Sequence, residues 1–162
     1  MMDKIGTEAK IIGTIVIFTI IVLVGGVFLL SSQQSQDTSI PEEQIVSSNG
    51  LHWHPTLEIY IKGDKQEIPP NTGIGTVHQP IHTHEDAAQG VIHMEMSGTV
   101  TKDETRIGNF FKVWGKEFSS NQIFDSVNGE EGKVRMMVNG VESDQFENYE
   151  MKDGDKIEIR YE

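Results

Sequence analysis

The sequence contains no cysteine. This absence excludes disulfide bonds, thiolate metal sites, a lipid-modified cysteine and catalysis by a cysteine nucleophile. It leaves the compartment open, because exported proteins can also lack cysteine. Any metal site in this chain must therefore use other ligands, such as imidazole, carboxylate or thioether groups.

Basic residues are scarce as well. The 162 residues include 13 lysines and arginines against 25 aspartates and glutamates, which gives a formal net charge of −12. Residues 1–30 contain two acids and two bases, so the rest of the chain carries all of this charge. Such an acidic chain is repelled by nucleic acid and by anionic lipid surfaces. We therefore expect no nucleic-acid partner.

One long stretch lacks charge altogether. Residues 11–30 read IIGTIVIFTIIVLVGGVFLL, and at about 1.5 Å per residue such a helix spans a bilayer core of about 30 Å. The alternative interpretation is a cleaved signal peptide, but the apolar part of such a peptide is usually shorter than this stretch. Lys4 and Lys10 precede it, so the positive-inside rule places the N-terminus in the cytoplasm. We predict a signal anchor at residues 1–30, single-pass in the cell membrane, with an extracytoplasmic C-terminal domain.

The chain after this stretch divides into a linker and a domain. Residues 31–50 are rich in serine, glutamine and acids, which is typical of a flexible linker. Residues 51–162 are expected to fold. At the start of this domain Leu57, Ile59 and Ile61 alternate with polar residues, the pattern of a half-buried strand.

The first half of the domain predicts two hairpins. In the first, Gly63-Asp64 makes the turn and residues 66–68 form the return strand. In the second, residues 81–84 and 91–96 are the strands, joined by a loop at residues 86–90.

A helix is predicted after the hairpins. Residues 101–104, Thr-Lys-Asp-Glu, have the form of a capping box, and Gly115 can end the helix. Apolar residues at i, i+3, i+4 and i+7 form one face: Ile107, Phe110, Phe111 and Trp114. We expect this face to pack on a sheet; a ligand pocket or a membrane contact is the alternative.

The C-terminal part returns to strand patterns. Residues 133–138 alternate, Asn139-Gly140 is a two-residue hairpin turn, and residues 157–161 form a last strand. The order of elements predicts an α+β fold, with one main helix on a mixed or antiparallel sheet. The last thirty or so residues, from VRMMVNG to KIEIRYE, resemble the close of a β-grasp (ubiquitin-like) domain, which implies a β-grasp-like fold.

All six histidines lie between residues 52 and 93. Residues two apart on a strand share a face, so each His-x-His pair points to one side, and His93 shares its side with Glu95. In the second predicted hairpin, opposed Cβ atoms lie about 4.5–5.5 Å apart, close enough for imidazoles to converge on one ion. The predicted metal ligands are His82, His84 and His93, with His54 and His52 completing the site.

Three further residues are weaker candidates. Glu95 either ligates the ion or orients a histidine, while His78 and Glu85 are expected mainly at the surface. Met94 and Met96 lie on the opposite strand face and are expected to pack in the core. Because the affinity of nitrogen sites peaks at copper, a copper ion is the expected cofactor and zinc the alternative.

Several motifs together resemble a group of uncharacterised exported or membrane-anchored bacterial and archaeal proteins. They are His-x-His-x-x-Leu-x-Ile-x-Ile-x-Gly (52–63), Ile-Pro (68–69), Ile-His-Thr-His (81–84), Gly-Val-Ile-His-Met-Glu (90–95) and Ile-Gly-x-Phe-Phe-x-Val-Trp-Gly (107–115). The resemblance covers about residues 51–141. It implies that the histidines act as a unit, and it implies no reaction.

The sequence favours a membrane-anchored metal-binding protein for metal handling or delivery. Two alternatives stay open. One is an interaction or scaffold domain with structural histidines. The other is a metal-dependent enzyme with an open three-histidine site, against which stands the lack of a general base other than Glu85 or Glu95.

Overall fold

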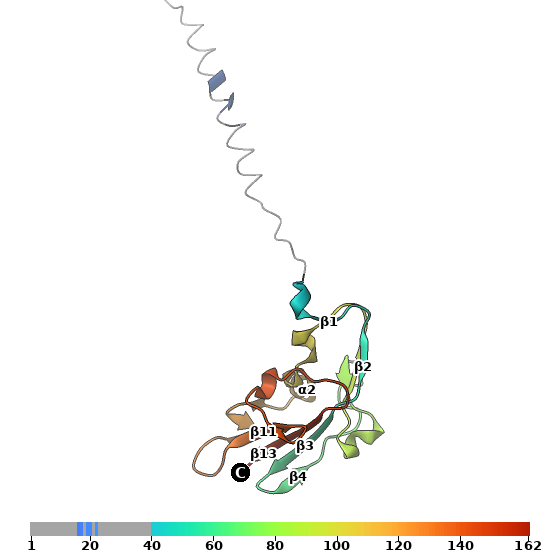
Figure 1. Ribbon diagram of the computed structural model, residues 1–162, viewed down its shortest axis with the longest axis vertical. Coiled ribbons are helices and arrows are strands. Elements are labelled where there is room, and N and C mark those ends of the chain that lie inside the picture. Colours follow the sequence, from blue (N-terminus) through green and yellow to red (C-terminus); the bar gives the residue numbers. More distant parts are fainter. Residues whose placement is uncertain (1–15, 18, 21, 23–39) are drawn as a thin grey trace, which may run out of the picture. The chain divides into compact units, whose positions relative to one another are not determined.

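The computed structural model describes residues 16, 17, 19, 20 and 22, which are helical, and residues 40–162 (Figure 1). Within these residues, no helix has the length and apolar character needed to cross a membrane. The predicted anchor at residues 11–30 falls largely outside the described residues. Residues 40–162 form a compact unit of their own, and the description below concerns this unit.

Its centre is a five-stranded sheet in the order β12-β11-β13-β3-β4 (Figure 1). The two longest strands, β3 and β13, pair in parallel, with Thr56 beside Lys156 and Tyr161 beside Ile61. All other neighbours pair antiparallel, so the sheet is mixed. Its strands are β3 (Thr56–Ile61), β4 (Asp64–Gln66), β11 (Val134–Val138), β12 (Val141–Glu142) and β13 (Lys156–Tyr161).

One α-helix of this unit, α2 (Ile107–Trp114), packs against the sheet (Figure 1). Ile107, Phe110 and Phe111 are buried in the same core as the inward side chains of β3, β11 and β13. Burial of each of these large side chains stabilises the fold by about 1.5–3 kcal/mol. The expected packing face is confirmed, and with it an α+β domain with a helix on a sheet.

The capping box forms, but it does not start the α-helix. Glu104 Oε2 accepts hydrogen bonds from the backbone N–H (2.8 Å) and the hydroxyl (2.7 Å) of Thr101. These bonds begin the 3₁₀ turn η3 (Lys102–Thr105) instead. Arg106 follows in an extended conformation, and this break separates η3 from α2. Gly115, with φ +70°, ends α2 as predicted.

The turn of the first hairpin lies one residue earlier than expected. Lys62 and Gly63 both have positive φ, 52° and 89°, as a two-residue turn of type I′ requires. The return strand is therefore β4, and the prediction of residues 66–68 is wrong. The turn at Asn139 and Gly140, with φ of 53° and 81°, is confirmed.

A separate three-stranded sheet, which we call the histidine sheet, has the order β2-β6-β5. Its strands are β2 (Leu51–Trp53), β5 (Ile81–His82) and β6 (His93–Met96). β5 and β6 pair antiparallel, with Ile81 opposite Met94, so the second hairpin is confirmed with shorter strands. Ile81 and Met94 are buried on one side, which attaches this sheet to the core.

The 3₁₀ turn η2 (Glu85–Gln89) and Gly90 connect β5 to β6. Gly90 has φ +81°, and a Cβ there would meet the carbonyl oxygen of Leu57. Its own carbonyl accepts a hydrogen bond from Leu57 N–H at 2.8 Å. Only glycine fits this close approach, which fixes the hairpin against β3.

Short elements complete the unit. β1 (Ile45–Ser47) pairs with β7 (Val100–Thr101), so part of the predicted linker is ordered as a strand. The remaining elements are η1 (Glu42–Gln44), β8 (Phe118–Ser119), β9 (Gln122–Ile123), β10 (Ser126–Val127) and η4 (Phe146–Asn148).

Candidate metal centre

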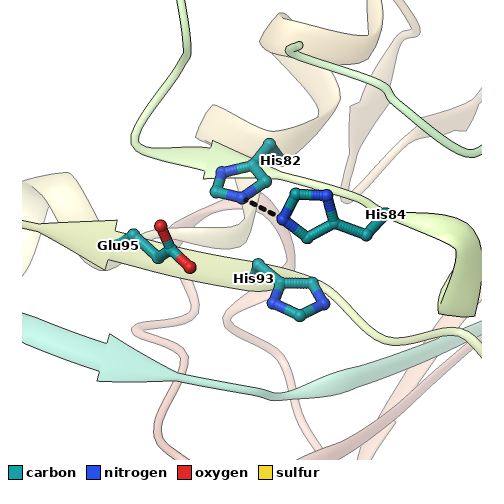
Figure 2. Close-up of side chains that lie close together, drawn as sticks. All are labelled: His82, His84, His93 and Glu95. Carbon is teal, nitrogen blue, oxygen red and sulfur yellow. Dashed lines mark hydrogen bonds between the residues drawn. The ribbon is translucent and has the colours of Figure 1, made fainter.

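The strongest metal-ligand candidates lie on or beside one face of the histidine sheet. β6 is its middle strand, with β5 on one side and β2 on the other (Figure 2). His82 lies opposite His93 across the β5–β6 pair, and His52 lies opposite Glu95 across the β2–β6 pair. The alternation of a strand places these side chains on one face and Met94 on the other.

Four of the predicted residues form what we call the inner group: His82, His84, His93 and Glu95 (Figure 2). Each offers a ligand atom, and these atoms all lie within 4.8 Å of one another. His82 is fully buried, His84 is half-buried, and the His93 side chain is 14% exposed. The Glu95 side chain is 43% exposed. Three imidazoles and a carboxylate form a donor set that can hold a metal ion.

The tautomer of His82 is fixed by its surroundings. Its Nδ1–H donates to the backbone carbonyl of Gln79 at 3.0 Å, which leaves the lone pair on Nε2, facing the group. Burial lowers the pKa of His82, and the bond to Gln79 opposes this only in part. His82 is therefore held neutral, which is the form that binds a metal.

The ring nitrogens of His84 and His82 are about as far apart as two nitrogens that bind the same metal ion. The Nε2–H of His84 donates to His82 Nε2, with 3.1 Å between the nitrogens (Figure 2). Two imidazole nitrogens bound to one tetrahedral ion at about 2.0–2.1 Å lie about 3.3 Å apart. An ion can take the place of this proton at nearly the same nitrogen–nitrogen distance, once the His84 proton moves to Nδ1 and both rings tilt so that their lone pairs meet at the ion.

The sequence reasoning missed the partner of His93. Its Nε2–H donates to the Asp86 carboxylate, at 3.1 Å from Oδ1 and 3.0 Å from Oδ2. This bond leaves the lone pair of His93 on Nδ1 and fixes the orientation of the ring, as carboxylates do behind metal-bound histidines. Asp86 lies in η2, where strand alternation does not apply, so its spacing from His93 gave no signal.

His52 and His54 do not join the inner group. With His93 they make a second set of ligand atoms within 4.8 Å of one another, which we call the outer group. His52 Nε2 also lies 3.4 Å from Glu95 Oε1. The backbone N–H of His54 donates to Asp153 Oδ1 at 2.8 Å, which fixes the chain just after β2. His93 belongs to both groups because it lies on the middle strand.

Of the three weaker candidates, Glu95 lies in the inner group, and the other two lie outside both groups. His78 is exposed, with its ring centroid 4.2 Å from that of His82. Glu85 is exposed too, and its Oε1 accepts a hydrogen bond from Asn71 at 3.3 Å. A cleft of about 450 Å³ opens beside the inner group, and His78, His82 and Glu95 are among the residues that line it.

Fold and site together define an α+β protein with a histidine-rich group that could hold a metal ion. No protein-family model matches the chain, and neither the curated proteins nor the solved structures contain a significant match to it. The functional argument therefore rests on the residues of the histidine sheet.

Proposed function

We propose that this protein is a membrane-anchored, extracytoplasmic metal-binding protein that handles or delivers a divalent transition metal, with copper favoured over zinc. One observation carries the proposal. The inner group brings three imidazoles and a carboxylate within 4.8 Å of one another. Hydrogen bonds to Gln79 and Asp86 fix the tautomers of two imidazoles, so that Nε2 of His82 and Nδ1 of His93 carry no proton.

The donor set supports the preference for copper. Affinity for divalent ions at nitrogen and oxygen ligands rises to a maximum at Cu²⁺ and falls again at Zn²⁺. Met94, whose thioether would favour Cu⁺, is fully buried on the opposite face. The inner group therefore suits Cu²⁺ and Zn²⁺ better than Cu⁺.

The location is argued from the sequence. Residues 11–30 are long enough to span a bilayer, and Lys4 and Lys10 precede them. The cysteine-free, acidic remainder presents the histidine sheet outside the cell.

The fold proposed for the domain is β-grasp-like. Supporting this, β3 and β4 form the first hairpin of the sheet, β13 enters between β3 and β11, and β3 and β13 are parallel. Fold leaves the function open, so the metal proposal depends on the site alone.

The test is equilibrium titration of the full-length protein with Cu²⁺ and Zn²⁺. We expect one ion per chain with a Kd below about 1 μM, equivalent to about −8.2 kcal/mol. His82→Ala/His84→Ala should abolish this binding. His78→Ala is the matched control, since His78 touches His82 without belonging to either group. Circular dichroism checks that each variant is folded. Binding weaker than micromolar for both ions would contradict the proposal.

The cleft beside His82 and Glu95 favours a second candidate, a metal-dependent enzyme whose ion keeps an open position. Water-proton relaxation of the Cu²⁺-loaded protein tests it. An exchanging water on the ion supports the enzyme, and its absence removes it. The scaffold alternative predicted widely separated imidazoles, whereas the six rings form one continuous series of contacts.

A further inference from the structure

The two groups of ligand atoms differ in their access to solvent. In the inner group His82 is fully buried, whereas in the outer group the side chain of His52 is 63% exposed and His54 is exposed. An ion arriving from solution can therefore reach two of the three outer ligands, His52 and His54, without any opening of the fold.

The groups are also continuous. The ring centroids of His52 and His54 are 4.7 Å apart, and those of His54 and His93 are 4.8 Å apart. On the other side, His93 lies 4.6 Å from His84 by the same measure. Glu95 links the groups a second time, since its carboxylate lies 3.4 Å from His52 Nε2. No gap separates the exposed ligands from the buried ones.

The shared histidine allows only one ion at a time. Asp86 accepts the hydrogen on His93 Nε2, so Nδ1 alone has a lone pair to give. In Figure 2 the two ring nitrogens of His93 lie on opposite sides of the ring, one towards Glu95 and the other away from it. An ion bound through Nδ1 of His93 therefore leaves this imidazole no second lone pair for another ion.

We propose that the outer group, His52, His54 and His93, is a loading site that captures a divalent transition-metal ion and passes it to the inner group. This rests on the proposed function. The ion keeps its bond to His93 while bonds to His52 and His54 break and bonds to Glu95, His82 and His84 form. No electron is transferred, and the one proton that must move is that on His84 Nε2. Glu95, on the shared strand and in reach of His52, is the ligand that receives the ion first.

The experiment compares loading rates in the full-length protein. Stopped-flow mixing with Cu²⁺ is applied to the wild type, to His52→Ala/His54→Ala and to His78→Ala as the control. Loss of the outer group should slow loading by about tenfold or more, because capture beside the buried site raises the local concentration of the ion. Release to a chelator should slow by the same factor, since both directions use one path. The equilibrium Kd and the stoichiometry of one ion should not change.

Three results would overturn the loading site. The first is an unchanged rate in His52→Ala/His54→Ala, or slow loading in His78→Ala instead, which would place the path at the cleft. The second is a large rise in Kd at unchanged loading rate, which would make His52 and His54 ligands of a single site. The third is binding of two ions by the wild type. In each of these results the wild type still binds a metal ion. If the proposed function is wrong, the wild type binds no ion in the equilibrium titration.

Discussion

Asp86 is the residue whose role changes most between sequence and structure. In the sequence it is one acid of a loop, next to Glu85. In the structure it accepts the Nε2–H of His93 with both carboxylate oxygens, while Glu85 accepts from Asn71 and points elsewhere. The two neighbours form a natural matched pair.

We predict that Asp86→Ala weakens Cu²⁺ or Zn²⁺ binding by about 10–100-fold, the usual cost of losing the partner of a metal-bound histidine. The imidazole of His93 then turns freely and exchanges tautomers. Glu85→Ala, which removes an acid of equal charge one residue away, should leave the affinity unchanged. Calorimetric titration measures both. Equal losses in the two variants would show that only net charge matters and would contradict this role of Asp86.

At this scale the sequence predicted the faces of the strands well. Alternation alone separates His82, His93 and Glu95 from Ile81 and Met94, because a strand has a period of two. Alternation could not predict whether the candidate ligands form one group or two. That depends on β6 lying between β5 and β2, which is a matter of strand order rather than of pattern.

At the scale of elements, the β5–β6 hairpin positions most of the inner group, and Gly90 fixes the hairpin. Gly90 and Gly140 have the same φ of 81°, but only at Gly90 does an added Cβ meet backbone, the carbonyl of Leu57. Alanine at Gly140 measures the free-energy cost of a left-handed conformation alone. Alanine at Gly90 adds the cost of displacing the hairpin.

We predict that Gly140→Ala lowers the free energy of unfolding by about 1–2 kcal/mol, the cost of placing alanine in the left-handed region, without any effect on metal binding. Gly90→Ala should cost more and should also weaken metal binding, since it pushes β6 and His93 away from β3. Urea unfolding measures the stability, and Cu²⁺ titration measures the affinity. Equal destabilisation with unchanged affinity in both variants would show that Gly90 does not position the site.

Elements built from local patterns were predictable: both hairpins, the aromatic face of α2 and its end at Gly115. The boundaries of these elements were less predictable. The hairpin turn moved by one residue because Lys62 accepts a positive φ, and the extended Arg106 detached the capping box from the helix. The parallel pair β3–β13 had no local signal in the sequence, since its partners lie a hundred residues apart.

At the scale of the whole molecule, the chain is uneven in charge. Residues 1–30 are balanced, and the remainder carries the net charge of −12. An acidic domain of this kind is repelled by anionic lipid. We therefore propose that membrane association comes from residues 11–30.

We predict that the full-length chain, expressed in a bacterial host, sediments with membranes and resists carbonate extraction, whereas a chain without residues 11–30 stays soluble. Protease added to spheroplasts should digest the C-terminal domain, because the positive-inside rule places it outside. Immunoblotting after fractionation measures both. Recovery of the full-length chain as a soluble protein, or protection of its domain from protease, would contradict the anchored topology.

The parallel pairing of β3 with β13 also sets an order in time. The central sheet cannot close until residues 156–161 have been made, because they form its middle strand, β13. The ligands of the inner group come from a hairpin whose strands are only eleven residues apart, His82 and His93. Contacts that close short loops form faster than those that close long ones. Synthesis runs from the N-terminus to the C-terminus. The imidazoles and Glu95 have therefore all been made before β13, the strand that completes the core. In the proposed function, the ligands of the inner group can therefore bind a metal ion before the central sheet has closed.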